Sequence, residues 1–316
     1  MKRKVILQGG KSLMVSLPIK WAKKFNVNKG DELETEVEGE RVCYAAKGET
    51  KGRRVSVNLS GLSERLIRYI LSGLHKSGYD EIEVHYDDQE VLNVIEDLTK
   101  NLFVGFAIIE QNSKKCVLRC ISKQIPSEFD TALRRAFLVT LSMGDSILSA
   151  LESAQFEQLS SIVKLEKTNN QLTNFCERLL NNYPFIYARK QHFLYVIIWN
   201  LEKVCDDYKY ICHLLSKRRT PMKASMLGVF AKVNALLRGY YEVFYKFDLE
   251  QLHNLIQERE VIEGDIRSLM GNLDKDECML LYYLLSATYK IIDFSASMVS
   301  IKQEITQKVQ PNTPES

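Results

Sequence analysis

The segment "VILQGGKSLMVSLPIKWAKKFNVNKGDEL", residues 5–33, decides the fold of the amino-terminal part of the chain and raises a question of charge. The first thirty residues contain eight Lys or Arg and no Asp or Glu, whereas residues 31–40 contain six acidic residues and no basic one. The formal net charge of the 316-residue chain is only +3, which hides this separation. A prediction of nucleic-acid binding therefore depends on the local clustering of charge.

Alternating apolar and polar residues predict short strands on both sides of this segment. Gly9 and Gly10 supply a turn between the first two strands, and Pro18 fits the first turn of a short helix at 19–25. The four expected strands are 5–7, 12–17, 33–38 and 42–45. Such a unit is too small to bury a good core alone, so we expect it to be completed by dimerisation.

Residues 47–122 are typical of a small α/β domain that connects the two ends of the chain. A strand at 55–59 precedes a helical pattern that ends at Gly78, and a strand at 81–86 precedes a helix at 88–101. Two further apolar runs form a hairpin around Asn112 and Ser113.

From Pro126 onward Gly and Pro become rare, and apolar residues recur at spacings of three and four, which predicts helices. The expected helices span about 127–153, 155–181, 187–216, 221–247, 249–271 and 276–307. The polar stretch "KRRTP" at 217–221 divides them into two groups. We therefore predict an all-α domain at 123–316 made of tandem three-helix bundles, at 127–216 and 221–307.

The first 46 residues resemble the AbrB/SpoVT (MazE-like) swapped-hairpin DNA-binding family. The resemblance is carried by "SLMVSLPIKWAKKFNVNKGDEL" at 12–33, with its order of strand, Leu-Pro, short basic helix and "KGDEL" turn. The usual glycine before the Leu-Pro strand is displaced, and "GGKS" stands upstream instead. The resemblance implies an interlaced dimer, a swapped-hairpin β-barrel, whose basic surface lies on DNA.

The last part of the chain resembles the PhoU (phosphate uptake regulator) family. The resemblance is carried by "NLEKVCDDYKYI" at 200–211, with a weaker echo in "TYKIIDFSASM" at 288–298. The order of the parts is similar to that of archaeal fusions of the two families. The expected fold class is thus multidomain α+β: a dimeric swapped-hairpin barrel, a small α/β unit and PhoU-like helical bundles.

The residues expected to bind DNA are Lys2, Arg3, Lys4, Lys11, Ser12, Lys20, Lys23 and Lys24. Clustered cations gain affinity for a duplex through counterion release, and a Lys-Ser turn offers an ammonium group, a hydroxyl and backbone N–H groups to phosphate. The alternative is a solvated basic face. Trp21 is expected in the core or the dimer interface.

The PhoU resemblance implies metal binding through carboxylates spaced by four residues, which share one helix face. Glu202 and Asp206 keep this spacing, and Glu166 and His213 are the next candidate ligands. The other positions of the motif have changed, which argues against a multinuclear cluster of divalent or iron-type metal. The alternative is a surface carboxylate pair bridged to Lys203 or Lys209.

Several classes of protein are disfavoured by the sequence. The longest apolar run, residues 193–199, is far shorter than the roughly 20 residues of a membrane span, and the seven cysteines include no CxxC pair. We therefore expect a cytoplasmic protein with reduced thiols. The sequence lacks a Walker A loop, HExxH and GxSxG, so we expect no enzyme.

Together these features favour a homodimeric transcriptional regulator that binds double-stranded DNA and acts in phosphate uptake or a related nutrient response. The helical bundles would sense a signal or dock a phosphate-transport or signalling protein. The alternative is a PhoU-type adaptor that binds a phosphate transporter or a sensor kinase, with the amino-terminal module used mainly for dimerisation.

Overall fold

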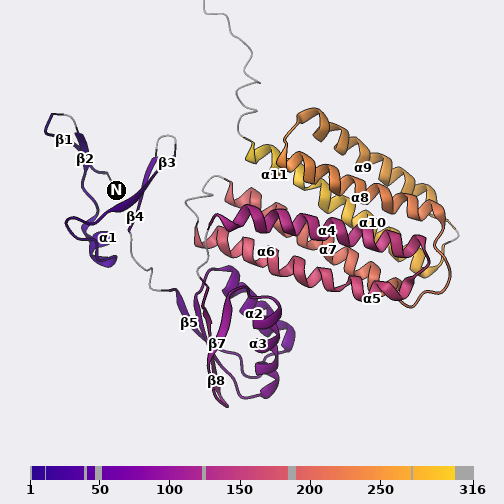
Figure 1. Ribbon diagram of the computed structural model, residues 1–316, viewed down its shortest axis with the longest axis horizontal. Helices are drawn as coiled ribbons and strands as arrows, with labels where there is room; N and C mark the ends of the chain where they lie inside the picture. The colour runs from indigo at the N-terminus through magenta and orange to yellow at the C-terminus, as the bar shows by residue number, and fades with distance from the viewer. Residues whose placement is uncertain are drawn as a thin grey trace, which may run out of the picture. The chain divides into compact units, whose positions relative to one another are not determined.

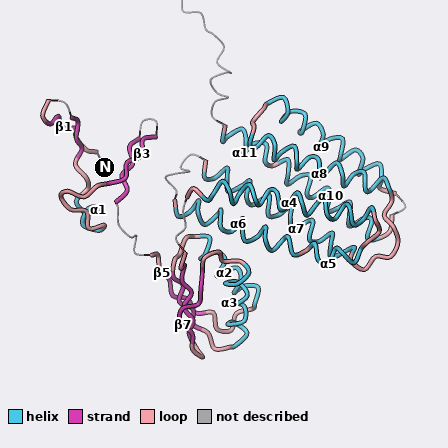
Figure 2. The backbone as a smooth tube through the Cα atoms, in the orientation of Figure 1, coloured by secondary structure: helices cyan, strands magenta, loops and turns pink. Residues whose placement is uncertain are grey.

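The structure is a computed structural model that describes residues 2–10, 12–38, 41–46, 52–122, 126–183, 190–271 and 273–302. The chain divides into two compact units, Met1–Arg53 and Arg54–Ser316, which are described separately below (Figure 1). Helices predominate in the second unit, and strands in the first (Figure 2). None of the described helices is both long enough and apolar enough to cross a membrane.

The first unit contains two separate antiparallel hairpins and one short helix. Strand β1 (Val5–Gln8) pairs with β2 (Ser12–Val15), and β3 (Leu33–Glu38) pairs with β4 (Arg41–Ala46). Gly9 and Gly10 adopt φ values of +61° and +73° in the first turn, a conformation that glycine adopts without steric cost. Helix α1 (Ile19–Lys24) follows Pro18. The predicted strands and helix are confirmed, whereas the barrel remains an expectation for the dimer.

In the part that the structure describes, the first unit has no core of its own. Among the side chains assessed in its described part, none is buried. The apolar side chains of β1 and β2 are exposed on both faces of the hairpin, from 45% at Val15 to 74% at Leu13. A two-stranded hairpin is marginal in water unless another element covers it. The described part of the unit thus leaves these side chains uncovered.

The second unit begins with a four-stranded sheet of order β5-β6-β8-β7. Strand β5 (Arg54–Asn58) lies parallel to β6 (Glu81–His85), which is antiparallel to β8 (Lys115–Cys120), and β8 is antiparallel to β7 (Phe106–Gln111). Helices α2 (Glu64–Lys76) and α3 (Gln89–Asn101) connect the strands. The strands and helices predicted for this α/β region are thus present in the structure.

The sheet has an apolar face and a charged face, as the period-two pattern requires. Ile82, Val84 and Leu118 are fully buried in one core cluster with side chains of α2 and α3. The opposite face carries ion pairs between neighbouring strands, such as Arg119 with Glu81 at 2.6 Å. One face of the sheet is thus covered by helices, and the other carries paired charges.

The rest of the second unit is helical. Its elements are α4 (Glu128–Glu152), a 3₁₀ turn at Phe156–Gln158, α5 (Leu159–Ile162), α6 (Lys164–Asn182), α7 (Gln191–Leu215), α8 (Ala224–Tyr245), α9 (Leu249–Leu269), α10 (Lys275–Ile292) and α11 (Phe294–Ile301). Two helices predicted as continuous are interrupted. The 155–181 helix breaks at Val163 and the 276–307 helix breaks at Asp293, although both residues keep φ and ψ values of the right-handed helical region.

These helices share one hydrophobic core. The buried apolar side chains from Phe129 to Ile301 form a single cluster. Helix α7 packs against α6 and also against α10, and α4 packs against both α6 and α8 (Figure 1). The two predicted groups of three helices are thus not separate bundles with separate cores, because α4 and α7 face both groups.

The loop between the two groups is held by charge. Arg218, which is 9% exposed, pairs with Asp274 at 3.0 Å and lies 3.8 Å from Glu277. Asp274 and Glu277 form a capping box at the start of α10. The basic stretch at 217–221 therefore binds inside the molecule through Arg218.

Candidate nucleic-acid interface and carboxylate cluster

The predicted DNA-binding residues occupy two places in the first unit. Lys2, Arg3 and Lys4 precede β1, and Ser12 is the first residue of β2; all four side chains are exposed. Lys11 lies outside the described residues. The turn that would present Lys11 and Ser12 to a phosphate group is therefore described only in part.

The remaining predicted contacts lie on α1. Lys20, Lys23 and Lys24 are exposed and follow the spacing i, i+3, i+4, which places them on one side of the helix. Lys23 and Lys24 occupy the last turn, where the helix dipole favours cations. Trp21 is partly buried, and its ring lies 5.5 Å from that of Phe25. Its expected burial in a core or a dimer interface remains a prediction.

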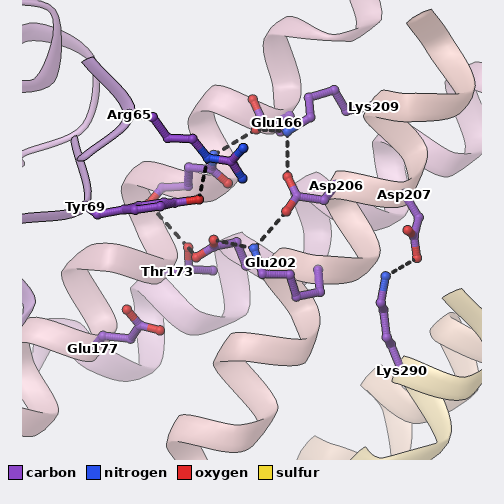
Figure 3. A network of polar contacts seen from close by, with 12 residues as sticks. Arg65, Tyr69, Glu166, Thr173, Glu177, Glu202, Asp206, Asp207, Lys209 and Lys290 are labelled. Carbon is purple, nitrogen blue, oxygen red and sulfur yellow. Dashed lines mark hydrogen bonds and ion pairs between the residues drawn. The ribbon is translucent and has the colours of Figure 1, made fainter. Parts of the chain in front are cut away.

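The structure brings three of the four predicted metal ligands together, and places lysines between them (Figure 3). The Lys209 ammonium group lies 2.8 Å from Glu166 and 2.6 Å from Asp206. The Lys203 ammonium group lies 2.8 Å from Asp206 and 3.2 Å from Glu202. The i, i+4 pair on α7 and Glu166 on α6 thus belong to one cluster of alternating charges.

The ion pairs keep this cluster charged at neutral pH. Burial alone would raise the pKa of Asp206, but hydrogen bonds from Lys203 and Lys209 outweigh burial and lower it. Burial alone would lower the pKa of Lys209, and its hydrogen bonds to Asp206 and Glu166 raise it instead. Each carboxylate therefore has an ammonium counter-charge within hydrogen-bonding distance.

This arrangement does not fit a metal site. The two ammonium groups supply the positive charge that a cation would supply between the carboxylates. His213 is exposed and lies seven residues beyond Asp206 on α7, about 10 Å along the helix axis. Within the part of the chain that the structure describes, no group of three or more His, Cys, Asp or Glu side chains is placed to hold a metal ion.

The cluster extends to a residue pair that the sequence pattern did not reveal. Lys76, near the end of α2, lies 2.7 Å from Glu177 on α6 and 3.8 Å from Glu202 on α7. Glu177 is fully buried, and burial raises its pKa to about 6 despite the attraction of Lys76. The ring of Trp199 lies 5.5 Å from the Lys76 ammonium group and 4.9 Å from that of Lys203. The cluster therefore joins the α/β part to the helical part.

A fully buried arginine completes this contact. Arg178 on α6 donates hydrogen bonds to the backbone oxygens of His75 and Tyr79, at 2.8 and 2.7 Å, and to the Asp80 carboxylate at 2.6 Å. Asn181 donates to the Lys76 backbone oxygen at 2.8 Å. The last carbonyl groups of a helix have no partner within the helix, so side chains of α6 cap the end of α2.

The histidine at this contact is held in an apolar setting. The His75 ring stacks on Phe103 with 4.5 Å between ring centres, and contacts Phe106 edge to face. Burial lowers its pKa well below the ordinary value, and the charges of Arg178 and Lys76 lower it further. His75 is therefore neutral and serves in packing.

Four of the six cysteines whose side chains the structure describes are buried. Cys116, Cys176, Cys205 and Cys212 are buried, and burial raises the pKa of Cys116 to about 11 and that of Cys212 to about 12. Thiols with such pKa values are poor nucleophiles. Cys278 is exposed, and all described cysteines are free.

Comparison with known proteins gives one match. Residues 6–43 match the family model described as antidote-toxin recognition MazE, bacterial antitoxin. No curated protein and no solved structure matches the chain. The match spans most of β1, all of β2, α1 and β3, and part of β4. It includes the exposed lysines of α1, whereas Lys2, Arg3 and Lys4 precede it. The amino-terminal part of the chain is therefore similar to the MazE/AbrB-like domains.

Proposed function

We propose that the protein is a homodimeric, DNA-binding transcriptional regulator. The observation that carries the proposal concerns the MazE-like segment and the residues before it. The first thirty residues carry cations and no carboxylate, and the apolar side chains of β1 and β2 are left uncovered in one chain. Cations grouped on one surface favour a polyanionic duplex.

A dimer would cover the exposed apolar side chains of the first unit and double its number of cations. A second copy of the two hairpins would cover the apolar side chains of β1 and β2, whose exposure in the single chain is costly at about 25 cal/mol per Å². It would also bring a second set of cations to the same assembly. Six lysines from the two α1 helices and the two basic amino-terminal arms would then face DNA together.

The salt dependence of binding tests this proposal. Full-length protein would be titrated with a fluorescent duplex of random sequence at several salt concentrations. The triple variant Lys20→Gln, Lys23→Gln, Lys24→Gln removes six cations per dimer, so the slope of log affinity against log salt should become shallower by up to about 5. A control variant, Lys164→Gln, Lys217→Gln, Lys275→Gln, removes the same charge from exposed positions of the second unit. Equal slopes for wild type and the α1 variant would contradict the proposal.

For the helical region we propose a sensing or docking role, and for the regulated process phosphate uptake or a related nutrient response. This finer proposal is supported only by the PhoU-like sequence at 200–211, which forms part of α7. The adaptor alternative predicts that the α1 variant still captures its phosphate-transport or kinase partner and that wild type leaves the duplex unbound. Capture of genomic DNA by the native protein distinguishes the two functions.

A further inference from the structure

A cavity of about 540 Å³ lies in the helical region, and none of its lining residues belongs to the carboxylate cluster. It is lined by the first two turns of α4, the start of α7, the last turn of α8 and the end of α11. Its volume falls in the range of sites that hold small molecules. The apolar part of its wall consists of Phe129, Leu194, Phe244 and Ile301.

The charged part of the wall is cationic. Arg134, Lys190 and Lys302 line the cavity, and Asp130 is the single carboxylate among its described lining residues. None of the three cations forms an ion pair with a residue that the structure describes. This contrasts with the carboxylate cluster, where each lysine lies against at least one carboxylate. The described lining thus carries three cations and one carboxylate, which leaves a net positive charge.

The position of Arg134 suits it to bind an anion. Its guanidinium group lies 4.2 Å from the centre of the Tyr245 ring. Stacking on an aromatic ring occupies the face of the guanidinium and leaves the N–H groups at its edge available for two parallel hydrogen bonds to a carboxylate or phosphate. The ring contacts Phe244 and Tyr241, with 5.0 and 5.1 Å between ring centres, so the platform under Arg134 is fixed.

The Tyr245 hydroxyl adds a second polar group at this wall. Its oxygen is shielded from solvent and lies close enough to the Arg134 guanidinium group for that cation to oppose the rise of its pKa, although the two form no hydrogen bond of standard geometry. Burial raises the pKa of Tyr245, so the group remains a neutral hydroxyl that can donate a proton to an acceptor. Buried polar atoms normally have partners, and an oxyanion beside Arg134 would provide one.

We propose that this cavity binds a small organic anion. Its carboxylate or phosphoryl group would meet Arg134 together with Lys190 and Lys302, and its apolar or aromatic body would pack against Phe129, Leu194 and Phe244. The binding itself is independent of the proposed function. An effect of the anion on DNA affinity, as an effector of the regulator, rests on that function.

Isothermal titration calorimetry of the full-length protein tests the proposal with two matched pairs of probes. AMP and adenosine differ in a phosphoryl group, and 4-hydroxybenzoate and 4-hydroxybenzamide differ in a carboxylate charge. We expect at least one anion to bind at millimolar concentration or better, and its neutral partner to bind at least about tenfold more weakly. The two pairs separate phosphoryl from carboxylate recognition.

Three variants locate the site. Arg134→Met and Lys190→Met should each weaken the anion at least about tenfold, whereas Arg135→Met, an exposed neighbour on α4 that does not line the cavity, should leave it unchanged. Thermal unfolding without probe checks that the variants are folded, and Lys190→Met serves should Arg134→Met unfold. Any of three results would overturn the proposal: no probe binds, the neutral probes bind as tightly as the anions, or the Arg134, Lys190 and Arg135 variants bind equally well. The cations at the cavity would then be ordinary solvated surface charges. Loss of DNA binding with intact anion binding would contradict the regulator alone.

Discussion

Replacing Arg178 by Met should lower the free energy of unfolding of the second unit by about 2–4 kcal/mol. The guanidinium group donates to two buried backbone oxygens, those of His75 and Tyr79, and to the carboxylate of Asp80. Met fills much of the same volume but donates nothing. The Tyr79 oxygen loses the Arg178 hydrogen bond at about 1–3 kcal/mol, and the His75 oxygen, which still accepts from the Gly78 backbone N–H at 3.0 Å, loses about 1 kcal/mol. Asp80 is 38% exposed in its side chain and can regain water, so it adds little to this sum.

Urea unfolding measures the total cost, and amide hydrogen exchange measured by mass spectrometry shows where it falls. Exchange should increase first at the end of α2 and in the following turn, residues 75–80, because these are the groups that α6 caps. Exchange in the middle of α7 should change last.

Arg238→Met is the matched control. Arg238 also pairs with an aspartate, Asp145, but both side chains are about half exposed, at 48% and 51%. An exposed pair of this kind contributes about 0–1 kcal/mol. The reasoning is refuted if the two variants lose the same stability, or if exchange at residues 75–80 is unaffected by Arg178→Met.

Three further predictions follow from single residues. The pKa of Glu177 is raised from 4.5 to about 6, so its stabilising contribution is complete below pH 4.5 and is lost as pH rises through 6. Glu177→Gln should therefore remove about 2 kcal/mol of the pH dependence of the free energy of unfolding. Urea unfolding of wild type and variant at several pH values measures this difference. Gly144→Ala should destabilise by about 1–3 kcal/mol, since the new Cβ would lie 2.6 Å from Asn234 and 3.0 Å from the Tyr208 ring, whereas Gly228→Ala, with open space around it, should be neutral or stabilising in thermal unfolding. Leu13→Glu should convert the proposed dimer to a monomer in sedimentation velocity, because Leu13 is 74% exposed in one chain and would be covered by the second copy. If wild type is a dimer and the variant remains one, β2 does not contribute to the interface.

Local periodicity was sufficient to predict most elements of the fold. The alternation around Leu13 marks a strand of four residues, and spacings of three and four mark the long helices from α4 to α10. The same rules failed at Val163 and Asp293, where helices break while the apolar spacing continues. The spacing of apolar residues shows which face of a helix is buried. A local interruption of the helix does not change that spacing, so the spacing cannot reveal the interruption.

The candidate site was predictable only where its partners are close in sequence. Glu202 and Asp206 share a helix face because of their spacing, and Lys203 and Lys209 are their neighbours on the same helix. The pairing of Lys76 with Glu177 joins residues that are far apart in the chain, so no local rule indicates it. The presence of acidic, amide and basic residues on the buried face of α6 was the one available signal, because such groups enter a core only when they are paired.

The capping of α2 by α6 has a practical consequence for dissecting the molecule. A fragment that stops at the end of β8 would contain the whole sheet and both of its helices, yet it would lack the donors that occupy the last oxygens of α2. A fragment cut at the edge of the sheet would therefore have a less stable carboxyl end of α2. To keep these donors, a fragment must extend to the end of α6 at residue 182. The apolar side chains of α6 would then be exposed unless the remaining helices are also included.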